Sequence, residues 1–372
     1  MSFQEIHAKK MDPRRRPLPI TNVAASLVAT SVAVARLDQR LQGHPLLPAF
    51  LLRARLETVS AQAATDGYHI DPWRLVAVLE GLPLRQPAEA VDRADLHDAT
   101  WCAYDLYAWL TLGGGQRQRS IDAAMRGIAA EDQTQGPLLC AGEAFHRWVW
   151  QRNRRRAPMR AALVRYWQTA GLLRNPIPLT GAAAFAADAP HTRAEWIATF
   201  LAVLQGEAER FDTLLSRLEY TWRTGHQAIQ GQRSTSRAGE VLNLLTVRPV
   251  LSASCAAEQL GMSINTALHY LERMVEKRIA VEITFRRSRR FFSLKDCDGL
   301  TETIAEPRRW RESNRTSRQD DAIRIAAKCS APLPSAGCRQ GLDYGDLDKA
   351  LQAADRAIVK FLAQIGDRTE ME

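Results

Sequence analysis

Apolar residues recur at helical spacing almost continuously from residue 21 to about residue 224. Apolar positions three and four apart mark one face of an α-helix, whereas a half-buried strand alternates strictly. Alternation of that kind is scarce before residue 279, so residues 20–225 are expected to form an all-α domain. The predicted helices are 21–42, 46–64, 71–80, 92–111, 119–130, 137–152, 158–173 and 193–225.

The last of these helices carries a long apolar stripe that extends from Trp196 to Trp222. Such a stripe either belongs to a core or forms a seam between subunits. It is our candidate for the seam of a homodimer. Residues 226–236 are rich in Gly, Gln, Ser, Thr and Arg, which predicts a polar linker after the helix.

The pattern changes at residue 237. Residues 238–245 place apolar residues at helical spacing, and a second short apolar helix is predicted at about 254–260. Gly261 supplies a tight turn and Ser263 an N-cap. The third helix, 264–277, has one apolar face, which consists of Ala267, Leu271, Met274 and Val275.

A basic β-hairpin is predicted directly after the third helix. It comprises a strand at 279–285, an arginine-rich turn at 286–290 and a returning strand at 291–294. Three short helices followed by such a hairpin are typical of a winged helix-turn-helix, here over 237–296. The predicted fold class is therefore mainly α: a helical N-terminal domain plus a C-terminal winged helix-turn-helix with a small β-hairpin.

This arrangement predicts a site for double-stranded DNA. Asparagine can pair with adenine and arginine with guanine, so the exposed side of the third helix is expected to contact bases. Those base-contact candidates are Asn265, Thr266, His269 and Arg273. Cationic and hydroxyl side chains nearby are expected to contact phosphates. Those candidates are Ser263, Lys277, Arg286, Arg287, Arg289 and Arg290.

The alternative is a winged helix that binds protein, in which the same polar residues are merely solvated. Ile264 and Leu268 also lie near the expected groove side. Arg278 stands where such domains usually have a glycine C-cap. These features weaken the DNA interpretation.

The positive charge of the chain is informative because it is clustered. The net charge is +9, and arginines gather at 14–16, 152–156, 286–290 and 308–318. A positive balance favours an anionic partner, although it also serves solubility. The run at 152–156 is either a second phosphate-contacting patch or an ordinary loop, and the sequence does not decide between them.

Three segments are predicted outside the two domains. Residues 1–19 are basic and contain prolines, which predicts a mobile arm. Residues 297–342 predict a basic, disordered tail. Residues 343–366 predict a C-terminal helix that is net acidic and suited to a basic surface.

Cysteine usage and hydropathy predict a cytoplasmic protein without a membrane partner. The six cysteines are scattered and form no Cys-x-x-Cys pair, which favours reduced thiols. No apolar run approaches the ~18–20 residues that span a bilayer. Residues 14–37 imitate a signal peptide, but polar residues interrupt the apolar run and the helical pattern continues to Leu41.

The sequence offers no catalytic motif. The eight histidines are dispersed without metal-ligand spacing. The segment 113–119 is glycine-rich and basic, yet it lacks the Gly-Lys-Ser/Thr ending of a P-loop. We therefore expect neither enzyme activity, nor a cofactor, nor a metal. An unrecognised enzyme in the helical domain remains a further alternative.

Several segments of the latter half resemble the helical end and winged helix of Fic-type proteins. They are Trp196 to Arg223, Ser236 to Glu240, Arg248 to Leu251, Cys255 to Ser263, Leu271 to Met274 and Glu282 to Phe292. The catalytic signature of that family, His-Pro-Phe followed by Gly-Asn-Gly-Arg, is absent from this sequence. This resemblance implies a catalytically inactive scaffold that mediates protein–protein interaction.

The whole chain resembles more closely a group of rhizobial, often plasmid-borne, proteins. Those proteins have a helical domain of unknown function followed by a helix-turn-helix DNA-binding domain. The match lies in Arg53 to Glu57, Asp71 to Leu75, Val78 to Leu82 and Pro249 to Ala253, and it covers roughly residues 20–310. It implies DNA binding, and we expect a transcriptional regulator that acts as a homodimer.

Overall fold

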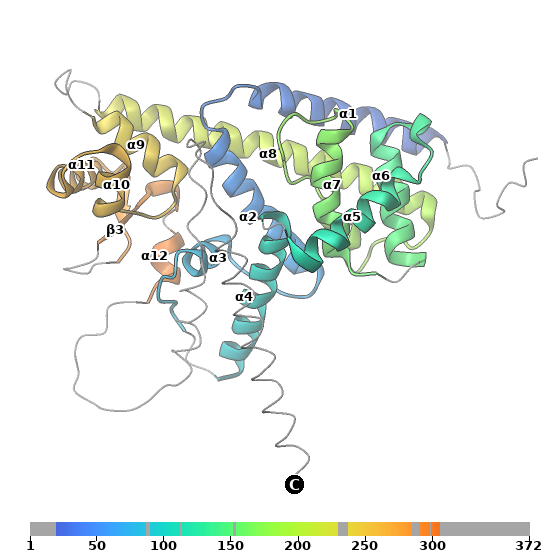
Figure 1. Cartoon of the computed structure of the whole chain (residues 1–372), viewed down its shortest axis with the longest axis horizontal. Coiled ribbons are helices and arrows are strands. Elements are labelled where there is room, and N and C mark those ends of the chain that lie inside the picture. The colour runs from blue at the N-terminus through green and yellow to red at the C-terminus, as the bar shows by residue number, and fades with distance from the viewer. Residues whose placement is uncertain are drawn as a thin grey trace, which may run out of the picture. The chain divides into compact units, whose positions relative to one another are not determined.

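The computed structural model of the chain describes residues 20–86, 90–111, 114–151, 154–229, 237–284, 290–297 and 299–305. This part of the chain is mainly helical and contains a small three-stranded sheet (Figure 1). The predicted arm at 1–19, the predicted C-terminal helix at 343–366 and residues 306–342 of the predicted tail lie outside the described ranges.

The predicted helices of the first 229 residues are confirmed, with ends shifted by a few residues. They are α1 (Ile20–Leu41), α2 (Leu47–Thr65), α3 (Pro72–Leu79), α4 (Ala90–Thr111), α5 (Gly115–Ala129), α6 (Pro137–His146), α7 (Arg156–Thr169) and α8 (Arg193–Ile229). Short 3₁₀ helices, η1 (Gln133–Gln135) and η3 (Ala182–Phe185), lie between them.

Two helix ends differ from the sequence prediction. The helix predicted to end at residue 152 is α-helical only to His146 and continues as a π-helical turn, η2 (Arg147–Gln151). Helix α8 continues to Ile229, so the linker predicted to begin at residue 226 begins later. The reason is packing, because Ile229 is buried and a Cβ at Gly225 would lie 2.9 Å from Leu242.

The apolar stripe of α8 forms the centre of the first hydrophobic core. Trp196 and Phe200 are fully buried, and their rings stack with centroids 5.2 Å apart. Helix α1 lies along α8 (Figure 1), where the Thr30 hydroxyl donates to the Leu201 carbonyl oxygen at 2.8 Å. The expectation that this stripe supplies a dimer seam is therefore wrong, because its apolar side chains pack in the core of a single protomer.

A second group of elements begins at Ala238. It consists of α9 (Ala238–Val247), β1 (Leu251–Ser252), α10 (Ala253–Leu260), α11 (Ile264–Glu276), β2 (Ala280–Glu282) and β3 (Phe291–Leu294). The sheet order is β1-β3-β2, and both pairings are antiparallel. Leu251 faces Phe292 in the register, and Ala280 faces Leu294. The predicted strand at 279–285 is thus shorter than the sequence pattern suggests.

The beginning of the predicted disordered tail is folded, which corrects that prediction. After the 3₁₀ turn η4 (Lys295–Cys297), the helix α12 (Gly299–Thr303) packs against α3, and Leu300 and Ile304 are buried. The backbone N–H of Arg85 donates to the Thr303 carbonyl oxygen at 2.8 Å. The sequence pattern is too short to reveal this contact, because it depends on residues more than 200 positions upstream.

The second hydrophobic core joins this group to the first half of the chain. Buried residues of α2, α3 and α4 pack in one cluster with those of α9, α10, α11 and the sheet. Leu56 and Leu75, for example, belong to the same cluster as Leu245 and Phe292. The elements α9 to α11 and the sheet are therefore held against the preceding helices by a common core in addition to the chain connection.

Candidate functional site

The turn between α10 and α11 and the start of each helix are built from local capping signals, of which the sequence predicts Gly261 and Ser263 but not Ser252. The Ser252 hydroxyl accepts from the Cys255 N–H at 3.2 Å at the start of α10. Gly261 ends that helix with φ +60°, a left-handed conformation that costs glycine little. The Ser263 hydroxyl then accepts from the Thr266 N–H at 3.1 Å and starts α11. These caps fix where α11 begins and thus which residues it exposes.

The end of α11 departs from the usual pattern. Arg278 has φ +58° and is the one non-glycine residue with positive φ among the described residues. Glycine is the usual residue in this conformation at the end of a helix. Here an arginine adopts it, at a cost on the order of 1 kcal/mol. The chain turns directly into β2 as a result.

Helix α11 has a buried face and a solvent face. Ala267, Leu271 and Met274 are buried in the second core, as the sequence pattern predicts. The predicted base-contact residues lie on the other side. Asn265, Thr266 and His269 are exposed and Arg273 is half-buried. The structure therefore brings these four side chains together on one helix surface.

The four side chains differ in their present partners. The Thr266 hydroxyl lies 2.8 Å from the Ser263 hydroxyl, so both belong to the helix cap. The His269 ring lies 6.2 Å from that of Tyr270. Within the described part of the chain, Arg273 forms no ion pair. On this surface, Asn265, His269 and Arg273 are thus the side chains that could form hydrogen bonds with a ligand.

Two of the predicted phosphate-contact residues, Lys277 and Arg290, already have partners within the chain. Lys277 donates its ammonium group to the Ala228 carbonyl oxygen at the end of α8. Arg290 lies at the base of the hairpin, where its guanidinium pairs with Glu272 of α11 and with Glu282 of β2, the latter at 2.7 Å. Arg286, Arg287 and Arg289 lie outside the described residues.

Arg290 is therefore not the free cation that the arginine run suggests. The hydrogen bonds that its guanidinium donates to the Glu282 and Glu272 carboxylates raise the pKa of that group further above its already high value. The guanidinium also lies 5.2 Å from the centroid of the Phe292 ring. The sequence could not show this, because Glu272 and Glu282 meet Arg290 only when β2 and β3 fold back over α11.

The second arginine run, at 152–156, is only partly described. The Arg156 guanidinium lies 3.2 Å from the Asp66 carboxylate and 4.7 Å from the Phe185 ring. Arg154 lies over the buried Trp148 ring at 4.6 Å, and the Trp148 indole N–H donates to the Arg155 carbonyl oxygen at 2.8 Å. Contacts within the chain account for Arg154 and Arg156, which favours a structural role for this part of the run.

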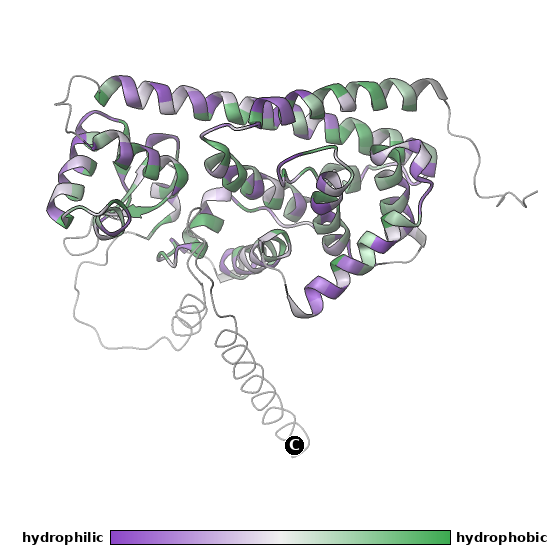
Figure 2. Cartoon of the chain, turned by 45° about the horizontal axis from the view of Figure 1, so that its top comes forward, coloured by the Kyte–Doolittle hydropathy of each residue, from purple (hydrophilic) through white to green (hydrophobic). Residues whose placement is uncertain are grey.

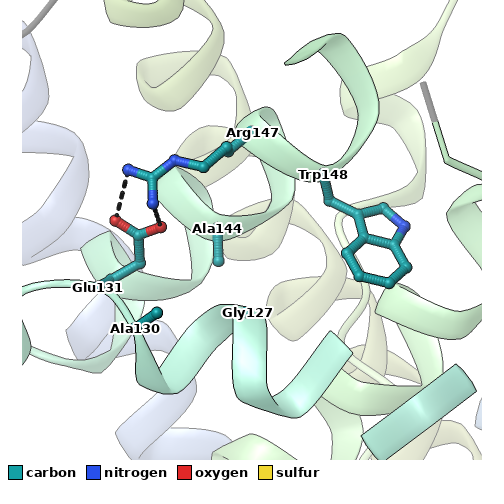
Figure 3. Close-up of a pocket in the computed structure, with 6 residues that line it drawn as sticks. All are labelled: Gly127, Ala130, Glu131, Ala144, Arg147 and Trp148. Atoms are coloured by element: carbon teal, nitrogen blue, oxygen red, sulfur yellow. Dashed lines mark hydrogen bonds and ion pairs between the residues drawn. The ribbon is translucent and has the colours of Figure 1, made fainter. Parts of the chain in front are cut away.

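A small pocket beside the π-helical turn has an ion pair in its wall. It is lined by Gly127, Ala130, Glu131, Ala144, Arg147 and Trp148 (Figure 3). The Glu131 carboxylate faces the Arg147 guanidinium, with an N–H···O distance of 2.9 Å. Each charge thus already has its partner, and we assign no ligand to the pocket.

The part of the chain that the structure describes offers neither a metal site nor a membrane span. There, no cluster of His, Cys, Asp or Glu side chains has the arrangement of a metal site. No helix in the described ranges is long and apolar enough to cross a bilayer.

Comparison with known proteins does not extend these observations. No protein-family model matches the chain, and no match is found among curated proteins.

Proposed function

We propose that this chain binds double-stranded DNA by placing α11 in the major groove and the β2–β3 hairpin beside the phosphate backbone. The observation that carries the proposal is the order of elements, helix–strand–helix–helix–strand–strand with the sheet order β1-β3-β2, combined with the polar solvent face of α11. This order resembles a winged helix-turn-helix. In DNA-binding domains of this kind the helix after the turn enters the groove.

The contacts follow from the position of each side chain on α11. Asn265 and His269 are one turn apart in the first half of the helix, where base edges are reached first. Arg273 follows one turn later and suits a guanine or a phosphate. On sequence grounds, Arg286, Arg287 and Arg289 of the hairpin turn neutralise phosphates.

The proposed role is that of a transcriptional regulator that binds as a homodimer. Two copies would add contact area and fix the spacing of half-sites. Because the α8 stripe is buried, the seam must lie elsewhere. On α1, Val28 and Val32 are 64% and 63% exposed and lie one turn apart. They are flanked by a run from Ile20 to Ala35 without charged residues, much of it green to pale in Figure 2.

The test is selection of random duplexes by the purified full chain at physiological salt. Asn265→Ala and His269→Ala should change the selected sequence. Arg286→Ala combined with Arg287→Ala should weaken binding to every duplex and flatten the salt dependence by ~0.9 for each phosphate that is no longer neutralised. Arg119→Ala combined with Arg126→Ala is the matched control, since it removes the same charge from exposed positions of α5.

Two outcomes would reject the proposal. One is the absence of any duplex affinity, together with protein partners retained after nuclease treatment, which would favour the inactive Fic-like scaffold. The other is an equal loss of duplex affinity in the Arg286/Arg287 double variant and in the Arg119/Arg126 double variant. That result would show that only the net charge of the chain matters for binding.

A further inference from the structure

Ile264 is an apolar side chain exposed to solvent at the start of α11. It is 56% exposed, and among the described residues from 237 onward it is the one exposed large apolar side chain. Single exposed apolar residues are common on proteins and need no explanation by themselves. The position of this one is unusual, because it lies between the Ser263 cap and Asn265 on the surface proposed to meet DNA.

Ile264 does not belong to the second hydrophobic core, and more than half of it is exposed. The buried face of α11 begins one turn later, at Ala267, and continues through Leu271 and Met274. Leu268, one turn beyond Ile264, is half-buried and packs against the second core. A β-branched residue has no advantage for helix formation at this site. An exposed polar residue there would avoid the exposed apolar area.

The neighbouring side chains indicate which partner would cover it. Ile264 and Leu268 form an apolar row along α11, and Asn265 and His269 form a polar row directly beside it. A partner that covers this surface must present an apolar group next to hydrogen-bonding groups. The major-groove edge of an A·T pair does so, with the thymine 5-methyl group beside the O4 acceptor and the adenine N6 and N7 atoms.

We infer that Ile264 packs against a thymine 5-methyl group in the major groove and thereby selects thymine over cytosine at that base pair. The inference rests on the proposed DNA binding and names the base chemistry that this surface recognises. The contact is apolar, so the methyl group rather than a hydrogen bond carries the preference. Asn265 and His269 supply the polar contacts to neighbouring base edges.

The experiment uses the duplex that the full chain selects and replaces each thymine in turn by deoxyuridine, which removes only the methyl group. The wild-type chain should bind about fourfold more weakly when the contacted thymine is replaced, the loss expected for one buried methyl group. Ile264→Ala should bind the thymine and deoxyuridine duplexes equally. Tyr220→Ala is the control, since it truncates an exposed large apolar side chain on α8, away from α11, and should keep the fourfold difference.

Three results would overturn the inference. If no deoxyuridine replacement weakens wild-type binding, no methyl group is contacted. If Ile264→Ala keeps the wild-type difference, another side chain makes the contact. A chain that selects no duplex at all would instead overturn the proposed function, and with it this inference, so the two failures are distinguishable.

Discussion

The Arg53 guanidinium donates to the Thr246 carbonyl oxygen at 3.0 Å and thereby joins the middle of α2 to the last turn of α9. The Arg53 side chain is only 5% exposed, and its other terminal nitrogen lies 3.3 Å from the Asp296 carboxylate. A cation near the last carbonyl groups of a helix compensates the negative end of the helix dipole. One side chain thus connects α2, α9 and the turn that follows β3.

The first prediction concerns this connection. Arg53→Ala should lower the free energy of unfolding by about 3 kcal/mol, because it leaves a cavity, an unpaired carbonyl oxygen and an uncompensated Asp296. Arg53→Lys keeps the charge but not the two-pronged geometry and should lose less. Urea unfolding measures both variants. Equal stability of Arg53→Ala and the wild type would show that the connection does not hold the elements together.

The second prediction concerns the loop before η3. Gly181 has φ +63°, and a Cβ there would overlap the fully buried Phe200 ring. Gly181→Ala should therefore lower the free energy of unfolding by about 3 kcal/mol or more, because backbone strain and a clash with the buried ring both contribute. Gly171→Ala is the matched control: φ is +70° and the site is open, so the cost should be only about 1 kcal/mol. Similar thermal midpoints for the two variants would contradict this packing.

The third prediction concerns alkaline pH. Burial raises the pKa of the Cys297 thiol from 9.0 to about 12. The folded chain thus holds this proton more tightly than the unfolded chain. The stabilising contribution is complete below pH 9 and is lost as pH rises from 9 to 12, at about 1.4 kcal/mol per pH unit. The Cys297→Ala variant has no thiol at this position, so its free energy of unfolding should fall less steeply than that of the wild type between pH 9 and 12. Parallel pH profiles would exclude the effect.

The fourth prediction concerns the proposed homodimer. Val28→Glu combined with Val32→Glu should abolish self-association in sedimentation velocity, because the two-fold contact would bury unpaired carboxylates. Thr213→Glu combined with Thr224→Glu adds the same charge at exposed positions of α8 and should leave association unchanged. A wild-type chain that is monomeric at every concentration, or a valine variant that still associates, would remove α1 as the seam.

Sequence reasoning succeeded where the signal is local. The N-cap at Ser263, the turn at Gly261 and the apolar face of Ala267, Leu271 and Met274 are set by residues within a few positions of one another. It failed where a residue's partner is distant in the chain. Arg290 resembled a free cation until Glu272 and Glu282 were seen to face it, and the α8 stripe resembled a seam until α1 was seen to cover it.

The sequence alone therefore determined the helices, their caps and the candidate reading surface of α11, because periodicity and capping act over one or two turns. Tertiary structure alone decided which apolar faces remain exposed, which arginines are already paired and how α9 to α11 are held. These properties depend on contacts such as Arg53 with Thr246, 193 residues apart. Which distant segments meet follows from the summed burial of the whole chain, and no short stretch of sequence contains that sum.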